Sequence, residues 1–375
     1  MNSSCNHLEE FILINLNLPI MTKIFFIIIL VLCCFSCSHK LVPSNLNKSS
    51  GKIGFTKNKI ETIKNLNLTV EQIVNAGGNV KRGKSILNRI NDFYLTDFTS
   101  IENIDWLSSQ KNILINLKGK SNKIVYLVAH YDKVDLNPLS FVSTLLNGVL
   151  DPLISWSYSS HGAIDNATGV AILLQLAKSI SNENFKYNYR ILLVGSEESG
   201  LRGSRSHVAK LSDSTFNNIL YTINTDVIGV KNKKNCVSTN VSNSKLSSLS
   251  FDVAKDLGIE LGAGKMPTFA CSDYAPFKKT SFIKDFGRSL QFNLVGAFLP
   301  QRSYFTKKKE TEVINFSSCK LVDIGDYIGS TLLIPIGSLH GFRDNIKLVD
   351  EIKLYEQYQL IYNFIKRIET LNELR

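Results

Sequence analysis

The chain has 375 residues, of which 44% are hydrophobic and 20% are charged, and its formal net charge is +11. This composition excludes a disordered protein and predicts a packed core, large enough for one large α/β domain or two ordinary domains. The positive charge does not indicate a nucleic-acid partner, because the lysines are spread along the chain and the densest cluster, residues 307–309, is followed by Glu310.

The first residues are typical of an export signal. Apolar residues fill positions 24–35 after Met21-Thr22-Lys23, a length that suits a signal peptide and is too short to span a bilayer. The segment ends at Ser36-Cys37 and resembles a bacterial lipoprotein signal, although Cys34 stands where leucine is usual. We therefore expect an exported protein, lipid-anchored to a bacterial membrane at Cys37, or else periplasmic or extracellular. A plain secretory signal and an uncleaved anchor are the alternatives.

Three segments follow from this interpretation. Residues 1–37 are the predicted leader, with Met21 a candidate start because the residues before it lack a basic n-region. Residues 38–60 are rich in Ser, Asn and Lys and predict a tether. Residues 61–375 show no internal repeat and no boundary between domains, which indicates a single domain.

Hydrophobic periodicity predicts alternating helices and strands beyond the tether. The expected elements, in chain order, are a helix at 81–94, strands at 112–117 and 124–129 forming a hairpin, a helix at 165–180, a strand at 190–195, a helix at 204–211, a strand at 221–230 and helices at 245–257 and 346–371. This alternation predicts an α/β fold, a three-layer sandwich with a central mixed, mostly parallel sheet flanked by helices.

Residues 133–161 interrupt one strand-to-helix connection. A connection of this length without clear periodicity is usually functional, so the insertion is expected to cover a site or shape a pocket. An extra helix packed on the core is the alternative. Outside the leader only Cys236, Cys271 and Cys319 remain, so at most one disulfide can form among them.

Acids and histidines recur at the ends of the predicted strands. Each of them alone has an ordinary explanation: a lone histidine is often structural, and an aspartate before a helix, such as Asp165, is most often an N-cap. Together they supply the nitrogen and oxygen ligands expected for a pair of zinc ions, whose charge would offset the repulsion among the carboxylates. The groups are Ala129-His130-Tyr131-Asp132, Gly162-Ala163-Ile164-Asp165-Asn166, Glu197-Glu198, Asn224-Thr225-Asp226 and the late segment His340 to Asp344.

Here the sequence resembles the co-catalytic di-zinc aminopeptidases. Their superfamily includes bacterial leucyl aminopeptidases, aminopeptidase Y, glutamate carboxypeptidase and the glutaminyl cyclases. The motifs that carry the resemblance are HxD, GAxDNxxGxA, EExGLxGS, NxDxxG and HxxxD, in order over roughly residues 80–370. The segment Ser272-Asp273-Tyr274-Ala275-Pro276-Phe277 also resembles the family's SDHxPF, with tyrosine in place of histidine.

The resemblance implies a role for each matched residue. His130, Asp165 and Glu198 would hold one zinc ion, and Asp226, His340 and again Asp165 would hold the other. Asp132 would orient His130, as metal-bound histidines usually require. Glu197 would be the general base that takes the proton from a metal-activated water and returns it to the leaving amine. Asp273 and Tyr274 would lie at the substrate site.

The resemblance thus implies an exported zinc-dependent exopeptidase, most simply an aminopeptidase acting on peptide substrates. A glutaminyl cyclase is the nearest alternative; such cyclases keep one zinc, held by the equivalents of Asp165, Glu198 and His340, and the DNxxG run at residues 165–169 favours the peptidases. A non-enzymatic binding protein on the same scaffold is the second alternative, although all the ligands and the base are present. The oligomeric state is left open by the sequence.

Overall fold

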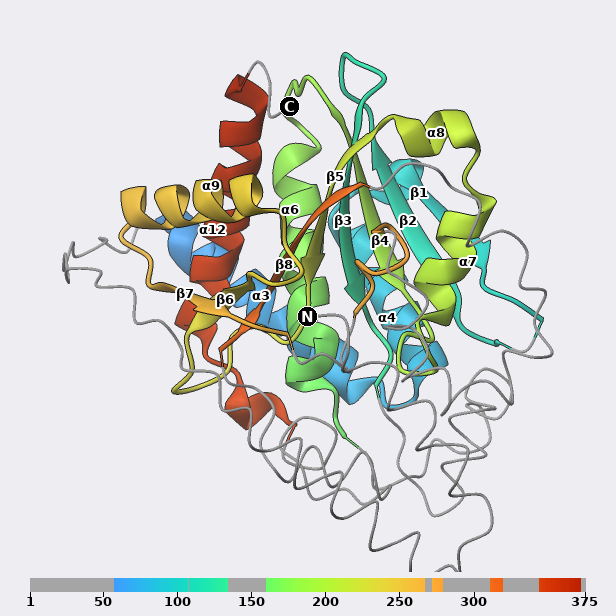
Figure 1. The fold of residues 1–375 in the computed structure, drawn as a ribbon. Coiled ribbons are helices and arrows are strands. Elements are labelled where there is room, and N and C mark those ends of the chain that lie inside the picture. The colour runs from blue at the N-terminus through green and yellow to red at the C-terminus, as the bar shows by residue number, and fades with distance from the viewer. Residues whose placement is uncertain are drawn as a thin grey trace, which may run out of the picture. The chain divides into compact units, whose positions relative to one another are not determined.

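The computed structural model describes residues 57–106, 108–133, 160–266, 272–278, 311–319 and 344–371 (Figure 1). The predicted leader, Cys37 and residues 38–56 of the predicted tether lie outside these ranges, as do residues 134–159 of the predicted insertion. Within the described ranges, no helix combines the length and the hydrophobicity needed to cross a lipid bilayer.

A mixed sheet forms the centre of the fold, and its described strands follow the order β1-β2-β4-β3-β5-β8-β6-β7. The neighbours β4, β3, β5 and β8 run parallel, and β1 and β2 join antiparallel at one side. The strands are β1 Thr99–Asn103, β2 Lys111–Leu117, β3 Ile124–His130, β4 Asn188–Val194, β5 Ile219–Thr225, β6 Asn235–Ser238, β7 Leu261–Gly264 and β8 Glu312–Ser318. The predicted α/β class with a mixed sheet is confirmed.

The sequence of β3 explains why it lies in the middle. All seven of its residues are buried, as in parallel strands that are covered on both faces. Val125 and Leu127 belong to one apolar cluster, and Tyr126 and Val128 belong to another. Because successive side chains of a strand point to opposite faces, the two clusters lie on the two sides of the sheet.

Helices cover both faces. The larger cluster contains residues of α3 (Lys57–Asn75), α4 (Asn79–Asp92), α6 (Thr168–Ile180), α9 (Ser244–Asp256) and α12 (Glu351–Thr370). The smaller cluster contains residues from α7 (Arg202–Lys210) and α8 (Asp213–Asn217). Figure 1 shows α6, α9 and α12 on one side of the central strands and α7 and α8 on the other. This is the predicted three-layer arrangement.

One predicted pairing is wrong. The strands at 112–117 and 124–129 were expected to form a hairpin, but β4 lies between them and pairs with both. The reason is the crossover through α6, which returns the chain parallel to β3 and places β4 beside it. The antiparallel partner of β2 on its other side is β1, a strand that the periodicity did not predict.

Helix boundaries also differ from the prediction, and one helix was not predicted. This helix, α3, begins at Lys57, so the last four residues of the predicted tether, 57–60, are helical. The helix α6 begins at Thr168 rather than at Asp165. A short 3-10 turn, Ile346–Leu348, precedes α12, which starts at Glu351 because the side chain of Asp350 caps its N–H groups.

A disulfide joins Cys236 in β6 to Cys319, the residue after β8, across a Cα–Cα distance of 5.2 Å. The two cysteines are 83 residues apart in sequence. The bond agrees with the expectation of at most one disulfide, and the third cysteine, Cys271, lies outside the described residues.

Candidate metal centre

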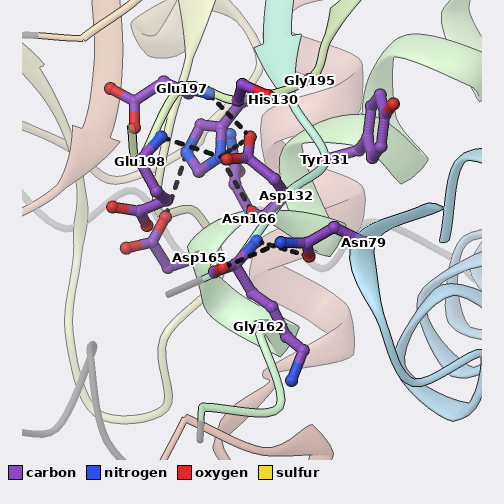
Figure 2. Close-up of polar contacts among 12 residues, drawn as sticks. Asn79, His130, Tyr131, Asp132, Gly162, Asp165, Asn166, Gly195, Glu197 and Glu198 are labelled. Atoms are coloured by element: carbon purple, nitrogen blue, oxygen red, sulfur yellow. Dashed lines mark hydrogen bonds and ion pairs between the residues drawn. The ribbon is translucent and has the colours of Figure 1, made fainter. Parts of the chain in front are cut away.

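His130 is the last residue of β3, and its side chain lies at the centre of the site (Figure 2). Its side chain is buried, and its Nε2 lies 3.0 Å from Asp165 Oδ1 and 3.2 Å from Asp226 Oδ1. Asp226 directly follows β5, the strand parallel to β3. The site therefore forms at the carboxyl ends of parallel strands, where open α/β sheets bind ligands.

Asp165 lies in a bend and does not cap a helix. Its φ and ψ of −114° and 86° are not helical, and neither are those of Asn166, at −142° and 45°. The N-cap position of α6 is Ala167, with no side-chain cap. The alternative of an ordinary capping aspartate is therefore wrong for Asp165, whose carboxylate faces the imidazole of His130.

Asp132 connects the end of β3 to the loop after β4. Its carboxylate is fully buried and accepts hydrogen bonds from the backbone N–H of Glu197 (3.0 Å) and of Glu198 (3.1 Å). The nearest contact of His130 Nδ1 with Asp132 is the backbone carbonyl oxygen, at 3.1 Å, while the carboxylate oxygen is 3.7 Å away. Asp132 thus contacts His130 as expected and also holds the backbone of both glutamates.

Glu197 and Glu198 take different positions. Glu198 offers a carboxylate oxygen within 4.8 Å of ligand atoms of His130 and Asp165. Figure 2 shows its carboxylate beside that of Asp165, whereas the side chain of Glu197 points elsewhere. Glu197 is buried all the same, with 6% of its surface exposed. The two neighbours are therefore placed for two different tasks.

The carboxylates control the charge of His130. Burial alone would lower the pKa of this imidazole, but the charge of Glu197 and contacts with Asp132, Asp165 and Asp226 raise the pKa well above its usual value. A histidine that attracts a proton this strongly marks a position where the protein stabilises positive charge. A metal cation would meet the same field.

The donor set fits zinc. One imidazole nitrogen and carboxylate oxygens are ligands that zinc accepts, and ligand atoms of one tetrahedral zinc lie about 3.3 Å apart for bonds of about 2.0 Å. The separations of 3.0 and 3.2 Å from His130 Nε2 to Asp165 and Asp226 match that spacing. Asp226 is therefore close enough to share an ion with His130, whereas the resemblance assigned the two residues to different ions. His340 lies outside the described residues.

The two predicted substrate-binding residues are buried. Asp273 has no exposed surface, and burial raises its pKa to about 7, with the charges of Asp132 and Asp226 raising it and that of His130 lowering it. Tyr274 is 2% exposed and packs in the smaller apolar cluster with Phe277. The charges of His130, Asp132 and Asp226 therefore act on Asp273, whereas Tyr274 is part of the apolar core. Substrate contact by either residue stays a prediction.

Two further residues support the site and were given no role from the sequence. Asn166 binds the backbone on both sides of Asp226. Its side-chain NH₂ group donates to the carbonyl of Thr225 (2.9 Å), and its side-chain oxygen accepts from the N–H of Val227 (3.4 Å). The Asp344 carboxylate accepts hydrogen bonds from the backbone N–H groups of Ile164 and Asp165, which lie in the bend. Both residues stand inside the quoted motifs, but a motif does not say which backbone groups a side chain will bind.

The chain is similar in sequence to known peptidases. Residues 112–292 match the sequence model of Peptidase family M28. Aminopeptidase YwaD of Bacillus subtilis (strain 168) is 28% identical over 133 residues, which are 36% of this chain and 23% of that protein. A probable zinc metalloprotease of Pyrenophora teres f. teres (strain 0-1) is 28% identical over 120 residues, which are 32% of this chain and 22% of that protein. The chain spans less than a quarter of the length of both relatives.

Solved structures share the fold. A leucine aminopeptidase precursor from Bacteroides thetaiotaomicron VPI-5482 superposes with a TM-score of 0.53 at 16% identity, covering 81% of this chain and 96% of that one. A glutaminyl cyclase from an Acidobacteriales bacterium superposes with a TM-score of 0.55 at 16% identity, covering 88% and 99%. The match of residues 112–292 to Peptidase family M28 confirms the resemblance recognised from the motifs, and the solved structures share the fold.

Proposed function

We propose that this chain is a zinc-dependent aminopeptidase that removes N-terminal residues from peptides. The observation that carries the proposal is the division between the adjacent glutamates. Glu198 lies with His130 and Asp165 in a set that can hold a metal ion, while Glu197 is buried beside that set. A metal-binding carboxylate next to a separate carboxylate that can move a proton is what metal-assisted hydrolysis requires.

The chain's own residues divide the work as follows. His130, Asp165, Glu198 and Asp226 would hold zinc, which when bound supplies a Lewis acid and an acidified water. Glu197 would take a proton from the attacking water and deliver it to the leaving amine. Two zinc ions per chain are proposed, and Asp165 and Asp226 would both be ligands beside His130, whose Nε2 lies 3.0 and 3.2 Å from their carboxylate oxygens.

Export is part of the proposal. The Cys236–Cys319 disulfide supports it, because disulfides persist mainly in oxidising compartments. The apolar segment at 24–35 and Cys37 support a lipid anchor on a bacterial membrane.

The experiment pairs the two neighbouring glutamates. Aminoacyl chromogenic substrates are assayed with and without a zinc chelator, and bound zinc is measured in Glu197→Gln and Glu198→Gln. We expect chelation to remove activity, Glu197→Gln to abolish turnover with zinc content near wild type, and Glu198→Gln to lose zinc as well as turnover. Substantial turnover in Glu197→Gln would show that this residue is not the general base.

A glutaminyl cyclase is the second candidate, because cyclases are among the solved structures with the same fold. Two measurements separate the candidates. Two zinc ions per chain and release of free N-terminal residues support the peptidase. One zinc ion per chain and ring closure of a peptide with N-terminal glutamine support the cyclase.

A further inference from the structure

Asp344 is a buried carboxylate with three hydrogen-bond donors around it. It has no exposed surface and precedes α12 in the C-terminal part of the chain. Its oxygens accept from the backbone N–H of Ile164 (2.6 Å), the backbone N–H of Asp165 (3.2 Å) and the hydroxyl of Ser160 (3.0 Å). All three donors lie in the segment that brings Asp165 to the site.

These contacts satisfy backbone groups that the bend leaves without helical partners. Asp165 and Asn166 have non-helical backbone angles, and α6 begins only at Thr168, so the helix does not bind the N–H groups of Ile164 and Asp165. The Asp344 carboxylate thus supplies the acceptor for the N–H groups of residues 164 and 165 in the bend.

Other contacts fix the same segment from its preceding side. Arg82 donates from α4 to the carbonyls of His161 (2.9 Å) and Gly162 (2.8 Å), and Lys133 Nζ donates to the carbonyl of Ser160 (2.9 Å). The chain before the bend is therefore anchored independently of Asp344. Loss of Asp344 would act on residues 164 and 165 in particular.

The arrangement repeats one already seen in the site. Asp132 is a buried carboxylate that accepts the backbone N–H groups of Glu197 and Glu198, one of them a predicted metal ligand. Asp344 does the same for Asp165. In each case a buried acid that is not itself a predicted ligand fixes the backbone from which a ligand projects.

We infer that Asp344 is a positioning residue for the metal centre: it holds the backbone of Asp165 so that the Asp165 carboxylate faces His130. It acts through Asp165 and does not bind metal. The inference rests on the metal site proposed above. Residues that orient metal ligands typically change metal affinity about 10- to 100-fold when they are replaced.

The test measures zinc affinity, which does not depend on turnover. Zinc-free wild type, Asp344→Asn, Ser160→Ala and Phe364→Leu are titrated with zinc in competition with a chromogenic chelator, and the Tm of each zinc-free protein is recorded. Asparagine keeps the shape of Asp344 but presents an N–H₂ group to one of the backbone donors. Phe364 is buried in α12 and is not one of the residues that hydrogen-bond to Asp344 in the described structure, so its substitution controls for a general loss of stability.

We expect Asp344→Asn to weaken zinc binding about 10- to 100-fold, Ser160→Ala to weaken it less, and Phe364→Leu to lower Tm with unchanged affinity. Unchanged affinity in Asp344→Asn overturns the inference and leaves the proposed function standing. An equal loss in Phe364→Leu also overturns it, because the effect is then general. If Asp344→Asn does not fold, Ser160→Ala decides: weaker binding at an unchanged Tm supports the inference, and unchanged binding overturns it. A wild type that binds no zinc refutes the proposed function itself.

Discussion

The substitution Asp132→Asn tests whether activity depends on the hydrogen bonds by which Asp132 holds the backbone of Glu197 and Glu198. Asp132 has no exposed surface, and its two oxygens accept the N–H groups of Glu197 and Glu198 at 3.0 and 3.1 Å. Asparagine has nearly the same shape but only one acceptor oxygen. One of the two N–H groups would therefore face a second donor instead of a carboxylate oxygen.

The magnitude follows from that single lost contact. A hydrogen bond to a charged group contributes about 1.5–3 kcal/mol. If this free energy holds the loop at residues 197 and 198 in its productive position, its loss lowers kcat/KM by a factor of about 10 to 150, since 1.36 kcal/mol corresponds to tenfold. The loss should appear mainly in kcat, because Glu197 is the proposed proton carrier.

The assay compares kcat, KM and bound zinc for Asp132→Asn and wild type on the best aminoacyl substrate. Thr222→Val serves as the control, because Thr222 is buried in β5 and its hydroxyl has no hydrogen-bond partner in the described structure. We expect the control to retain wild-type kinetics. Activity of Asp132→Asn within twofold of wild type would refute the idea that the Asp132 carboxylate positions the glutamate loop.

Three further predictions concern stability. In the zinc-free protein Asp273 gives up its proton near pH 7, whereas its ordinary pKa is 3.8, so ionisation penalises the folded state increasingly as pH rises between these values. Asp273→Asn should therefore raise the free energy of unfolding at pH 8 by up to about 4 kcal/mol and change it little at pH 4. Denaturant unfolding at both pH values measures this difference. An equal change at pH 4 and pH 8 would contradict the prediction. The pKa of Glu102 is lowered: burial raises it, but contacts with His207 and the charge of Lys210 lower it by more. Its stabilising effect is present above its ordinary pKa of 4.5 and is lost as pH falls, so Glu102→Gln should reduce Tm more at pH 7 than at pH 3.5, and a pH-independent reduction would argue against the ion pair. Removing the Cys236–Cys319 disulfide by Cys319→Ser should lower the free energy of unfolding in urea by about 2–5 kcal/mol. A reductant should no longer change the stability of this variant. A wild type whose stability is unchanged by reduction would be inconsistent with a stabilising disulfide.

The local pattern of the sequence determined much of the fold and the resemblance to a peptidase family. The continuous apolar run of β3 and the helical spacing in α6 predicted buried elements, and those elements are present. The polar residues after β3 and β5 predicted a metal site at one edge of the sheet, and the structure brings His130, Asp165 and Asp226 together there. This succeeds because burial has a simple period along a strand or a helix, and because parallel strands end at a common edge.

The tertiary structure alone decided which elements are neighbours and which polar groups meet. The predicted hairpin failed because pairing depends on the crossover that inserts β4, not on the pattern of either strand. The sequence left a helix cap open as an ordinary alternative for Asp165, and only the bend that places it against His130 excluded that alternative. The bond from the N–H of Asp165 to Asp344 joins residues 179 positions apart, and no local periodicity records such a contact. The sequence alone therefore identified the chemical groups of the site, and only packing over long sequence separations decided which buried acids hold the backbone in place.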